Sequence, residues 1–202
     1  MMSIQLIMFD LGGVLVRRQP ERLLAAVAKE TGLPAERLQR ELAASTWIDQ
    51  FERGRIEPRQ LHETLTNAMG LTWTFDQFVS AWNGILAEST DTTWMLERLR
   101  SRYKLLVLSN INVLHDEYIR ATWPVFSQVH YWIVSYQVGL RKPEPQIYQL
   151  ALRQADVPPE AAVYVDDTEE FVAAARHLGV HAIHFHDGLE LDAELRHAGV
   201  HV

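Results

Sequence analysis

Two acidic groups in this chain each follow a short apolar run. Asp10 comes after Leu6–Phe9 and is followed, after Leu11, by Gly12 and Gly13. The pair Asp166-Asp167 comes after the run 162–165. An apolar run of this length is typical of a buried parallel strand, and glycine lets the backbone turn away directly after it. Because parallel strands end at one edge of their sheet, we expect these carboxylates to meet there.

Two further segments supply groups that complement the carboxylates. Ser109-Asn110 ends a third apolar run, and Lys142 lies in the proline-stiffened loop 139–145. A carboxylate such as Asp10 can attack phosphorus covalently, but anions repel, so the site needs a divalent metal and a fixed cation. The acids offer hard oxygen ligands for Mg²⁺, while a lysine and a serine hydroxyl can hold phosphoryl oxygens.

The elements that must position these groups alternate between strand and helix. Strands are predicted near residues 4–9, 104–109, 129–134, 162–167 and 181–185, with helices after each of the later ones. This alternation predicts an α/β fold with a doubly wound parallel sheet. The tract between the first two strands is different, since its apolar spacing and Pro/Gly punctuation predict five short helices. We expect a core of residues 1–16 and 88–202 and an inserted α-helical cap of residues 17–87.

Composition limits the classes of function. The 202 residues carry a formal net charge of -7, are 48% hydrophobic and include no cysteine. The charge gives no reason to expect a nucleic acid or an anionic membrane as partner, and a cysteine nucleophile or thiolate metal site is excluded. No basic segment precedes an apolar stretch at the amino terminus, so we expect a cytoplasmic protein. The sequence does not indicate an oligomeric state.

Four ordered segments resemble the motifs of one superfamily. Asp10–Leu15, Leu108–Asn110, Gly139–Pro143 and Val165–Asp167 look like the four motifs of the haloacid dehalogenase (HAD) superfamily, and the helical insertion falls where the caps of its phosphatases do. Together with Phe51–Ile56, these segments look most like the branch of bacterial alpha-glucose-1-phosphate phosphatases. They also resemble the phosphatase domain of soluble epoxide hydrolases.

The resemblance implies a role for each matching residue. Asp10 would be the nucleophile that forms an aspartyl-phosphate and would also bind Mg²⁺, Asp166 would be a direct metal ligand, and Asp167 would act through a water molecule. Lys142 would stabilise the transition state. Ser109, with Asn110 beside it, would bind phosphate.

Gly12 departs from the usual phosphatase pattern, which has a second aspartate at this position to protonate the leaving oxygen. The Gly12 carbonyl can still serve as the backbone metal ligand. General acid–base help is typically worth about 10²–10⁴-fold, a loss that need not abolish turnover. A water, a cap residue or the substrate itself could replace the acid.

The sequence therefore predicts a Mg²⁺-dependent phosphatase for small phosphometabolites, with sugar phosphates such as glucose 1-phosphate preferred. One alternative is a catalytically weakened fold that binds a sugar phosphate or a protein. Another is a haloacid dehalogenase, although the acidic pair Asp166-Asp167 argues against this metal-free chemistry. A phosphonatase would need a cap lysine, and Lys29 is the only one between Val16 and Glu88.

Other prominent side chains have ordinary explanations. The cap aromatics Trp47, Trp73, Phe78 and Trp82 are predicted to form the bundle core, or in one case to face the substrate. Arg17 and Arg18 are the arginines closest to the site in sequence.

Overall fold

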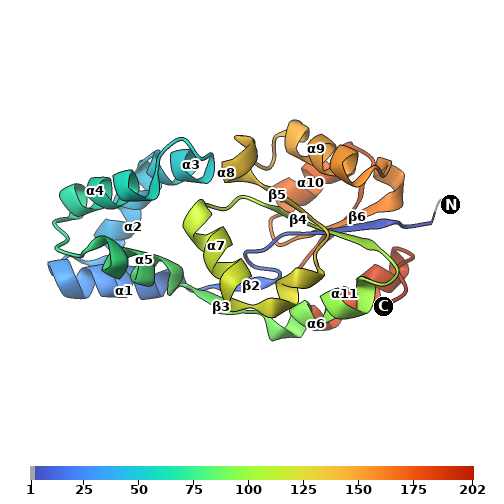
Figure 1. Cartoon of the computed structure of the whole chain (residues 1–202), viewed down its shortest axis with the longest axis horizontal. Helices are drawn as coiled ribbons and strands as arrows, with labels where there is room; N and C mark the ends of the chain where they lie inside the picture. Colours follow the sequence, from blue (N-terminus) through green and yellow to red (C-terminus); the bar gives the residue numbers. More distant parts are fainter. Residues whose placement is uncertain (1–2) are drawn as a thin grey trace.

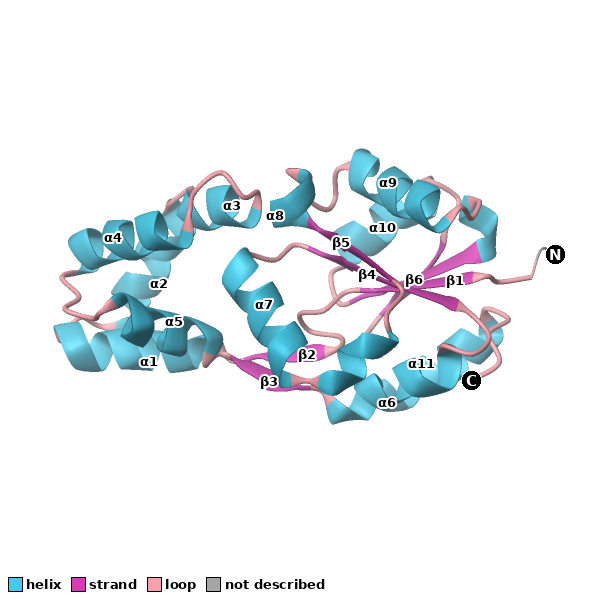
Figure 2. Ribbon diagram, in the orientation of Figure 1, coloured by secondary structure: helices cyan, strands magenta, loops and turns pink. Residues whose placement is uncertain are grey.

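The computed structural model describes residues 3–202, apart from the side chains of residues 38, 41, 43 and 44. Its centre is a five-stranded parallel sheet in the order β5-β4-β1-β6-β7. Figures 1 and 2 show this sheet between helices on both sides, with a separate group of helices at one end. The strands are β1 (Leu6–Phe9), β4 (Lys104–Ser109), β5 (Tyr131–Val134), β6 (Ala162–Asp166) and β7 (His181–His184).

The central strand shows why the sheet is covered on both faces. All four residues of β1 are buried, with Ile7 and Phe9 in one apolar cluster and Leu6 and Met8 in another. Successive side chains of a strand point to opposite faces, so two apolar layers must form. The first layer involves α6 (Thr90–Leu99), α7 (Val113–Thr122), α11 (Gly188–His197) and the 3₁₀ helix η1 (Pro124–Gln128). The second involves α9 (Pro145–Ala155), α10 (Glu169–His177) and the 3₁₀ helix η2 (Pro159–Ala161).

Five helices precede α6 in the segment between β1 and β4. They are α1 (Pro20–Thr31), α2 (Ala35–Ala44), α3 (Trp47–Glu52), α4 (Pro58–Met69) and α5 (Phe75–Asn83). They enclose an apolar cluster of their own, which includes Phe51, Leu61 and Phe78. Helix α7 contacts both regions, because its Leu114 belongs to this cluster while its Ile119 packs under the sheet.

A two-stranded antiparallel ribbon joins the helical group to the rest of the chain. It pairs β2 (Val16–Arg18) with β3 (Leu86–Glu88), so that Arg18 lies opposite Leu86. The division expected from the sequence, at residues 16/17 and 87/88, cuts through this ribbon. We propose that residues 17–87 form the cap and that residues 1–16 and 88–202 form the core, with β2 and β3 as the connection between them.

The predicted fold class, a doubly wound parallel sheet with helices on both faces, is confirmed. The ribbon was not predicted, and neither was the four-residue helix α8 (Ser135–Val138). Segments of three or four residues are too short to show a periodicity in the sequence. Within residues 3–202, none of the helices combines the length and the apolar character that crossing a membrane requires.

Candidate active site

Asp10 lies directly beyond the carboxyl end of the central strand. Its backbone N–H donates to the Val165 carbonyl of β6 (2.9 Å), which continues the pairing of β1 and β6 by one residue. The Leu11 N–H donates to Asp10 Oδ1 (2.7 Å), and the side chain is buried. The sheet therefore holds the carboxylate in a fixed orientation.

Gly13 is required by the geometry of the turn after Asp10. Its φ is +88°, a left-handed conformation that favours glycine, and an added Cβ would overlap the Asp167 carboxylate. The absence of a side chain at this position thus allows Asp167 to approach the turn that carries Asp10.

Lys142 bridges two of the carboxylates. Its Nζ lies 3.0 Å from Asp10 Oδ1 and donates to Asp166 Oδ2 at 2.6 Å. The Tyr164 hydroxyl donates to the same Asp166 oxygen, and the Thr168 N–H donates to Asp166 Oδ1 (2.8 Å). The ammonium is completely buried, so its charge acts on the two acids with little screening by water.

The electrostatics of Asp10 reflect a balance of opposing effects. Burial raises the pKa of Asp10, and the positive charge of Lys142 opposes that rise. The charge of Asp166 also raises the pKa, whereas a hydrogen bond with Ser109 lowers it. Lysine and serine therefore favour the ionised form of Asp10 in a site that otherwise disfavours charge.

Asn110 is used mainly to hold Lys142. Its Oδ1 accepts from the Lys142 N–H (2.9 Å), and its Nδ2 donates to the Lys142 carbonyl (3.0 Å). An amide nitrogen has two N–H groups, so one remains available for another acceptor. Ser109 is buried beside Asp10 at the end of β4.

Asp10, Asp166 and Asp167 satisfy a simple test for a divalent cation. Each offers a carboxylate oxygen, and these oxygens lie within 4.8 Å of one another. Hard oxygen donors that converge in this way suit Mg²⁺, and a cation would offset the mutual repulsion of the acids. The residues that the sequence proposes as ligands therefore fit the ion.

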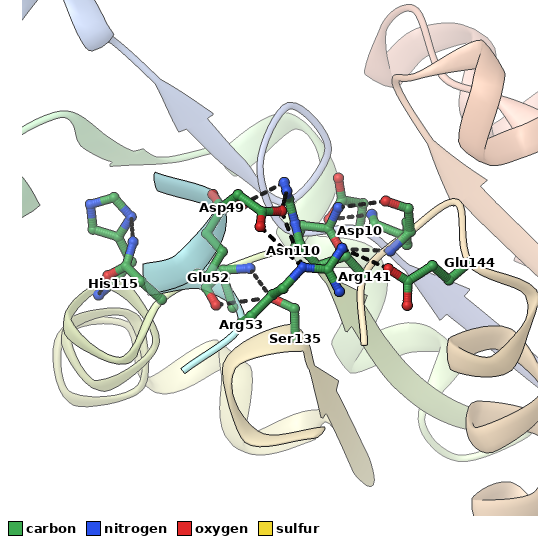
Figure 3. Close-up of polar contacts among 12 residues, drawn as sticks. Asp10, Asp49, Glu52, Arg53, Asn110, His115, Ser135, Arg141 and Glu144 are labelled. Atoms are coloured by element: carbon green, nitrogen blue, oxygen red, sulfur yellow. Dashed lines mark hydrogen bonds and ion pairs between the residues drawn. The ribbon is translucent and has the colours of Figure 1, made fainter. Parts of the chain in front are cut away.

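The cap reaches the site through α3 and its ion pairs. Arg141 donates to Glu52 Oε2 (2.6 Å) and to Asp49 Oδ1 (2.5 Å). Arg53 donates to Glu144 Oε1 (2.6 Å) and to the Gly139 carbonyl (3.2 Å). Figure 3 shows the two arginines among these acids, with Asp10 and Asn110 nearby. The network connects α3 to the loop that carries Lys142.

Glu52 stands out because of its environment. Burial raises the pKa of Glu52, and the charges of Arg141 and Arg18 oppose that rise. The negative charges of Asp49 and Asp10 raise it further. An acid with a raised pKa that senses the charge of Asp10 is a candidate for proton transfer.

A cavity of about 600 Å³ lies between the cap and the carboxyl end of the sheet. Asp10, Gly12 and Lys142 line it from the core, and Glu52 lines it from the cap. Its size falls within the range of roughly 300–1,000 Å³ that is usual for small-molecule sites. The cavity is therefore large enough for a phosphate and a leaving group.

Arg18 covers the space beside Gly12. A Cβ added to Gly12 would come within 2.8 Å of Arg18 Nε, and the guanidinium also lies 3.9 Å from Asp167 Oδ2. The arginine side chain is about half exposed, so it can move at little cost. The space beside Gly12 is occupied by a flexible cation.

The structure thus brings together every residue that the sequence proposed for the site: Asp10, Gly12, Ser109, Asn110, Lys142, Asp166 and Asp167. Sequence reasoning missed the support for the ammonium and for Asp166. Tyr164 bonds Asp166, and the Phe171 ring lies 5.0 Å from Lys142 Nζ. Tyr164 could have been suspected, because it lies two residues before Asp166 and so shares its face of β6.

Two known phosphatases align with nearly the whole chain. A sesquiterpene phosphatase of Aspergillus oryzae, astK, is 29% identical over 197 residues, which cover 93% of each chain. A D-ribitol-5-phosphate phosphatase of Bacteroides thetaiotaomicron is 24% identical over 197 residues, covering 94% of this chain and 95% of its own.

The fold has a close match among solved structures. A HAD family enzyme from Bacteroides thetaiotaomicron, in complex with magnesium and inorganic phosphate, superposes with a TM-score of 0.84 at 26% identity. The match covers 92% of this chain and 96% of that one.

The model of the haloacid dehalogenase-like hydrolase family matches residues 4–179. This match contains all four of the segments whose resemblance to the superfamily is visible in the sequence, and the chain is accordingly an enzyme of the hydrolase class with phosphatases among its relatives. The specific branch stays a prediction. The chain belongs to the haloacid dehalogenase-like hydrolase family.

Proposed function

We propose that this protein is a Mg²⁺-dependent phosphatase that hydrolyses small phosphomonoesters through a covalent intermediate on Asp10. The observation that carries the proposal is a buried ammonium among converging carboxylates. Lys142 Nζ lies 3.0 Å from Asp10 and 2.6 Å from Asp166, and the carboxylate of Asp167 converges with these two. Relatives that are phosphatases, and one that binds magnesium and phosphate, support it.

Mg²⁺ would be held by Asp10, by the Gly12 carbonyl and by Asp166, with Asp167 acting through a water molecule. When bound, the ion would offset the negative charge of the phosphoryl group and of the carboxylates. Because the ligand oxygens already converge, little rearrangement is needed to accept it.

The proposed reaction has two steps. An Asp10 carboxylate oxygen attacks phosphorus, the bond from phosphorus to the ester oxygen breaks, and the departing alkoxide takes up a proton. A water molecule then attacks the same phosphorus and gives a proton to the group that lost one in the first step. The bond between phosphorus and Asp10 breaks, which releases inorganic phosphate and restores the carboxylate. Lys142 neutralises charge on Asp10 and on the transferring group, and Ser109, with the remaining N–H of Asn110, binds phosphoryl oxygens.

We assign the proton in the first step to Glu52, since Gly12 has no side chain to supply it. Glu52 lines the same cavity as Asp10, and burial raises its pKa, which favours the protonated form. The hydrogen bond that Arg141 donates to Glu52 Oε2 (2.6 Å) holds the carboxyl group in place and leaves Oε1 to carry the proton.

The relatives support two classes of leaving group. The sequence favours sugar phosphates such as glucose 1-phosphate, and the D-ribitol-5-phosphate phosphatase supports that class. The sesquiterpene phosphatase supports a hydrocarbon instead. A cytoplasmic location and the lack of a nucleic-acid or membrane partner remain predictions from composition.

Phosphate release from a panel of phosphomonoesters, with and without Mg²⁺, tests the proposal. We expect release only with the ion, and trapping of phosphate on the protein after an acid quench. Asp10→Asn should abolish both signals, because an amide cannot attack phosphorus. Turnover by this variant would refute the assignment of the nucleophile, and lack of any activity in the wild-type protein would favour a binding module.

A dehalogenase is the second candidate, and the same protein tests it. Halide release from short 2-haloacids without Mg²⁺ would support it. The three converging carboxylates argue against it, because they would repel an anionic substrate when no metal is present.

A further inference from the structure

The cavity above Asp10 is polar at one end and mainly apolar at the other. At the phosphate end lie Asp10, Ser109 and Lys142, whereas the walls towards the cap and α7 are apolar. Six of these wall side chains are Leu23, Leu42, Ile48, Trp82, Ile85 and Ile111.

Most polar groups in the apolar walls already have partners. Asn112 Oδ1 accepts from Trp82 Nε1 (3.3 Å) and from the His115 N–H (3.1 Å). The two ring nitrogens of His115 pair with Asn112 Nδ2 (3.1 Å) and with the Trp82 carbonyl (3.0 Å). These three residues therefore satisfy one another at most of their polar atoms, and the second N–H of the Asn112 amide is the donor that remains available.

The charged groups of the cavity gather near the phosphate end. Arg141 precedes Lys142 in the chain and pairs with Glu52, while Arg18 lies beside Gly12 and Asp167. Arg141 Nε is buried without a hydrogen-bond partner among the described residues. The free hydrogen-bonding capacity of the cavity is thus close to the phosphoryl group, and little of it is left for a distant part of the substrate.

The apolar wall continues deeper into the cap. A second void of about 20 Å³ shares Leu23, Leu42 and Trp82 with the large cavity, and all of its lining residues are apolar. The side chains Val27, Leu65 and Phe78 also line this void.

We propose that the leaving group is an apolar alcohol, such as a medium-length alkyl or isoprenoid chain, which lies against the wall formed by Ile48, Trp82 and Ile111. This inference rests on the proposed phosphatase activity and identifies its substrate class. A polyol bound there would lose hydrogen bonds to water without replacement, which is costly, whereas an alkyl chain gains from leaving water.

Two measurements test the leaving group, and the first of them does not depend on turnover. Binding of n-alkylphosphonates, which cannot be hydrolysed, is measured by calorimetry with Mg²⁺ from ethyl to octyl, below the concentrations at which they aggregate. We expect the Kd to fall by up to about fourfold per buried methylene, equivalent to about 0.8 kcal/mol. The kcat/KM for the matching alkyl phosphates should rise in parallel and exceed that for glucose 1-phosphate and ribose 5-phosphate.

A matched pair of variants locates the effect. Ile48→Ala should reduce the gain in affinity from ethyl to octyl by about fourfold or more, because it removes wall surface. Ile56→Ala removes the same side-chain carbons from the cap cluster outside the cavity and should leave the gain unchanged. A Kd that does not depend on chain length, or a preference for the sugar phosphates, would overturn the proposal.

The outcomes also separate this inference from the proposed function. If affinity rises with chain length but none of the esters is cleaved, the ligand class stands and the phosphatase assignment fails. If acetyl phosphate and sugar phosphates are cleaved while the alkyl series binds weakly, the assignment stands and the apolar leaving group is wrong.

Discussion

Gly12 and Gly13 are neighbours with different structural reasons to be glycine. Gly13 has a φ of +88° and leaves no room for a Cβ beside Asp167, whereas the atoms nearest to a Cβ at Gly12 belong to the flexible Arg18 side chain. We therefore expect Gly13→Ala to displace Asp167 and to weaken the affinity for Mg²⁺ by about 10- to 100-fold. Gly12→Ala should change the affinity for Mg²⁺ by much less.

Titration of activity with Mg²⁺ measures this difference, and urea unfolding of both variants shows whether they are folded. Equal effects of the two alanines would mean that the approach of Asp167 to the turn does not matter for the metal.

Glu52 provides a prediction about proton transfer. Glu52→Gln keeps a hydrogen bond to Arg141 but removes the acid, so single-turnover cleavage of an alkyl phosphate should slow by about 10²–10⁴-fold. Acetyl phosphate should be affected far less, because acetate leaves without needing a proton. Rapid-quench measurement of phosphoryl transfer to Asp10 distinguishes the two substrates.

The variant Gly12→Asp serves as a rescue. An aspartate at position 12 can displace Arg18 and supply a proton at the position where the resemblance to the superfamily implies an acid in most phosphatases. In the Glu52→Gln background it should restore much of the lost rate. If Glu52→Gln slows acetyl phosphate and alkyl phosphates equally, Glu52 has a structural role and the proton comes from elsewhere.

Among the elements, α3 has an unusual position, because it belongs to the cap yet contacts the loop that carries Lys142. Arg53 is central to this contact through Glu144 and the Gly139 carbonyl. Arg53→Ala should weaken substrate binding through a shift of the loop, with KM raised more than kcat is lowered. It should also lower the free energy of unfolding by about 1–3 kcal/mol, since the lost hydrogen bonds involve charged groups in a half-buried site.

Arg55→Ala is the matched control, because Arg55 lies two residues away on an exposed surface. Steady-state kinetics and urea unfolding of the two variants provide the comparison. A similar result for both would show that the ion pairs between α3 and the loop contribute nothing to the site.

The elements also show what sequence can and cannot predict. Asp10 and Asp166 were predicted correctly to meet, because each follows an apolar strand and parallel strands end at one edge. The pairing of Glu52 with Arg141 was not predicted, since the two residues lie 89 positions apart in the chain and their contact depends on how the cap is placed. The apolar character of the cavity was equally hidden. It depends on the hydrogen bond from Trp82 Nε1 to Asn112 Oδ1, and the spacing of apolar residues in the sequence does not reveal such a bond.

For the whole molecule, His115 links stability to pH at the junction of core and cap. Burial lowers the pKa of His115 to about 4, and the charge of Arg18 acts in the same direction. The unfolded chain, with an ordinary histidine pKa near 6.5, therefore binds a proton that the folded protein does not bind between these values. Stability from this residue is complete above pH 6.5 and declines as the pH falls towards 4.

We expect the free energy of unfolding to decrease between pH 6.5 and 5 by up to about 1.4 kcal/mol per pH unit from His115. His115→Phe should be less stable at pH 7, because the bonds to Asn112 and Trp82 are lost, but should show a shallower decline. Burial also lowers the pKa of His130, so His130→Gln is the control that separates the two histidines. An unchanged slope in His115→Phe would rule out this role.

The ribbon of β2 and β3 has an evolutionary consequence. Since Arg18 and Leu86 face each other, the chain leaves the core and returns to it at one point, and residues 19–85 occupy what could be the loop of a hairpin. Insertions at such a site leave the order and register of the large sheet untouched. The core and the inserted segment can therefore diverge at different rates, and a single contiguous piece of gene can be exchanged without disturbing the sheet.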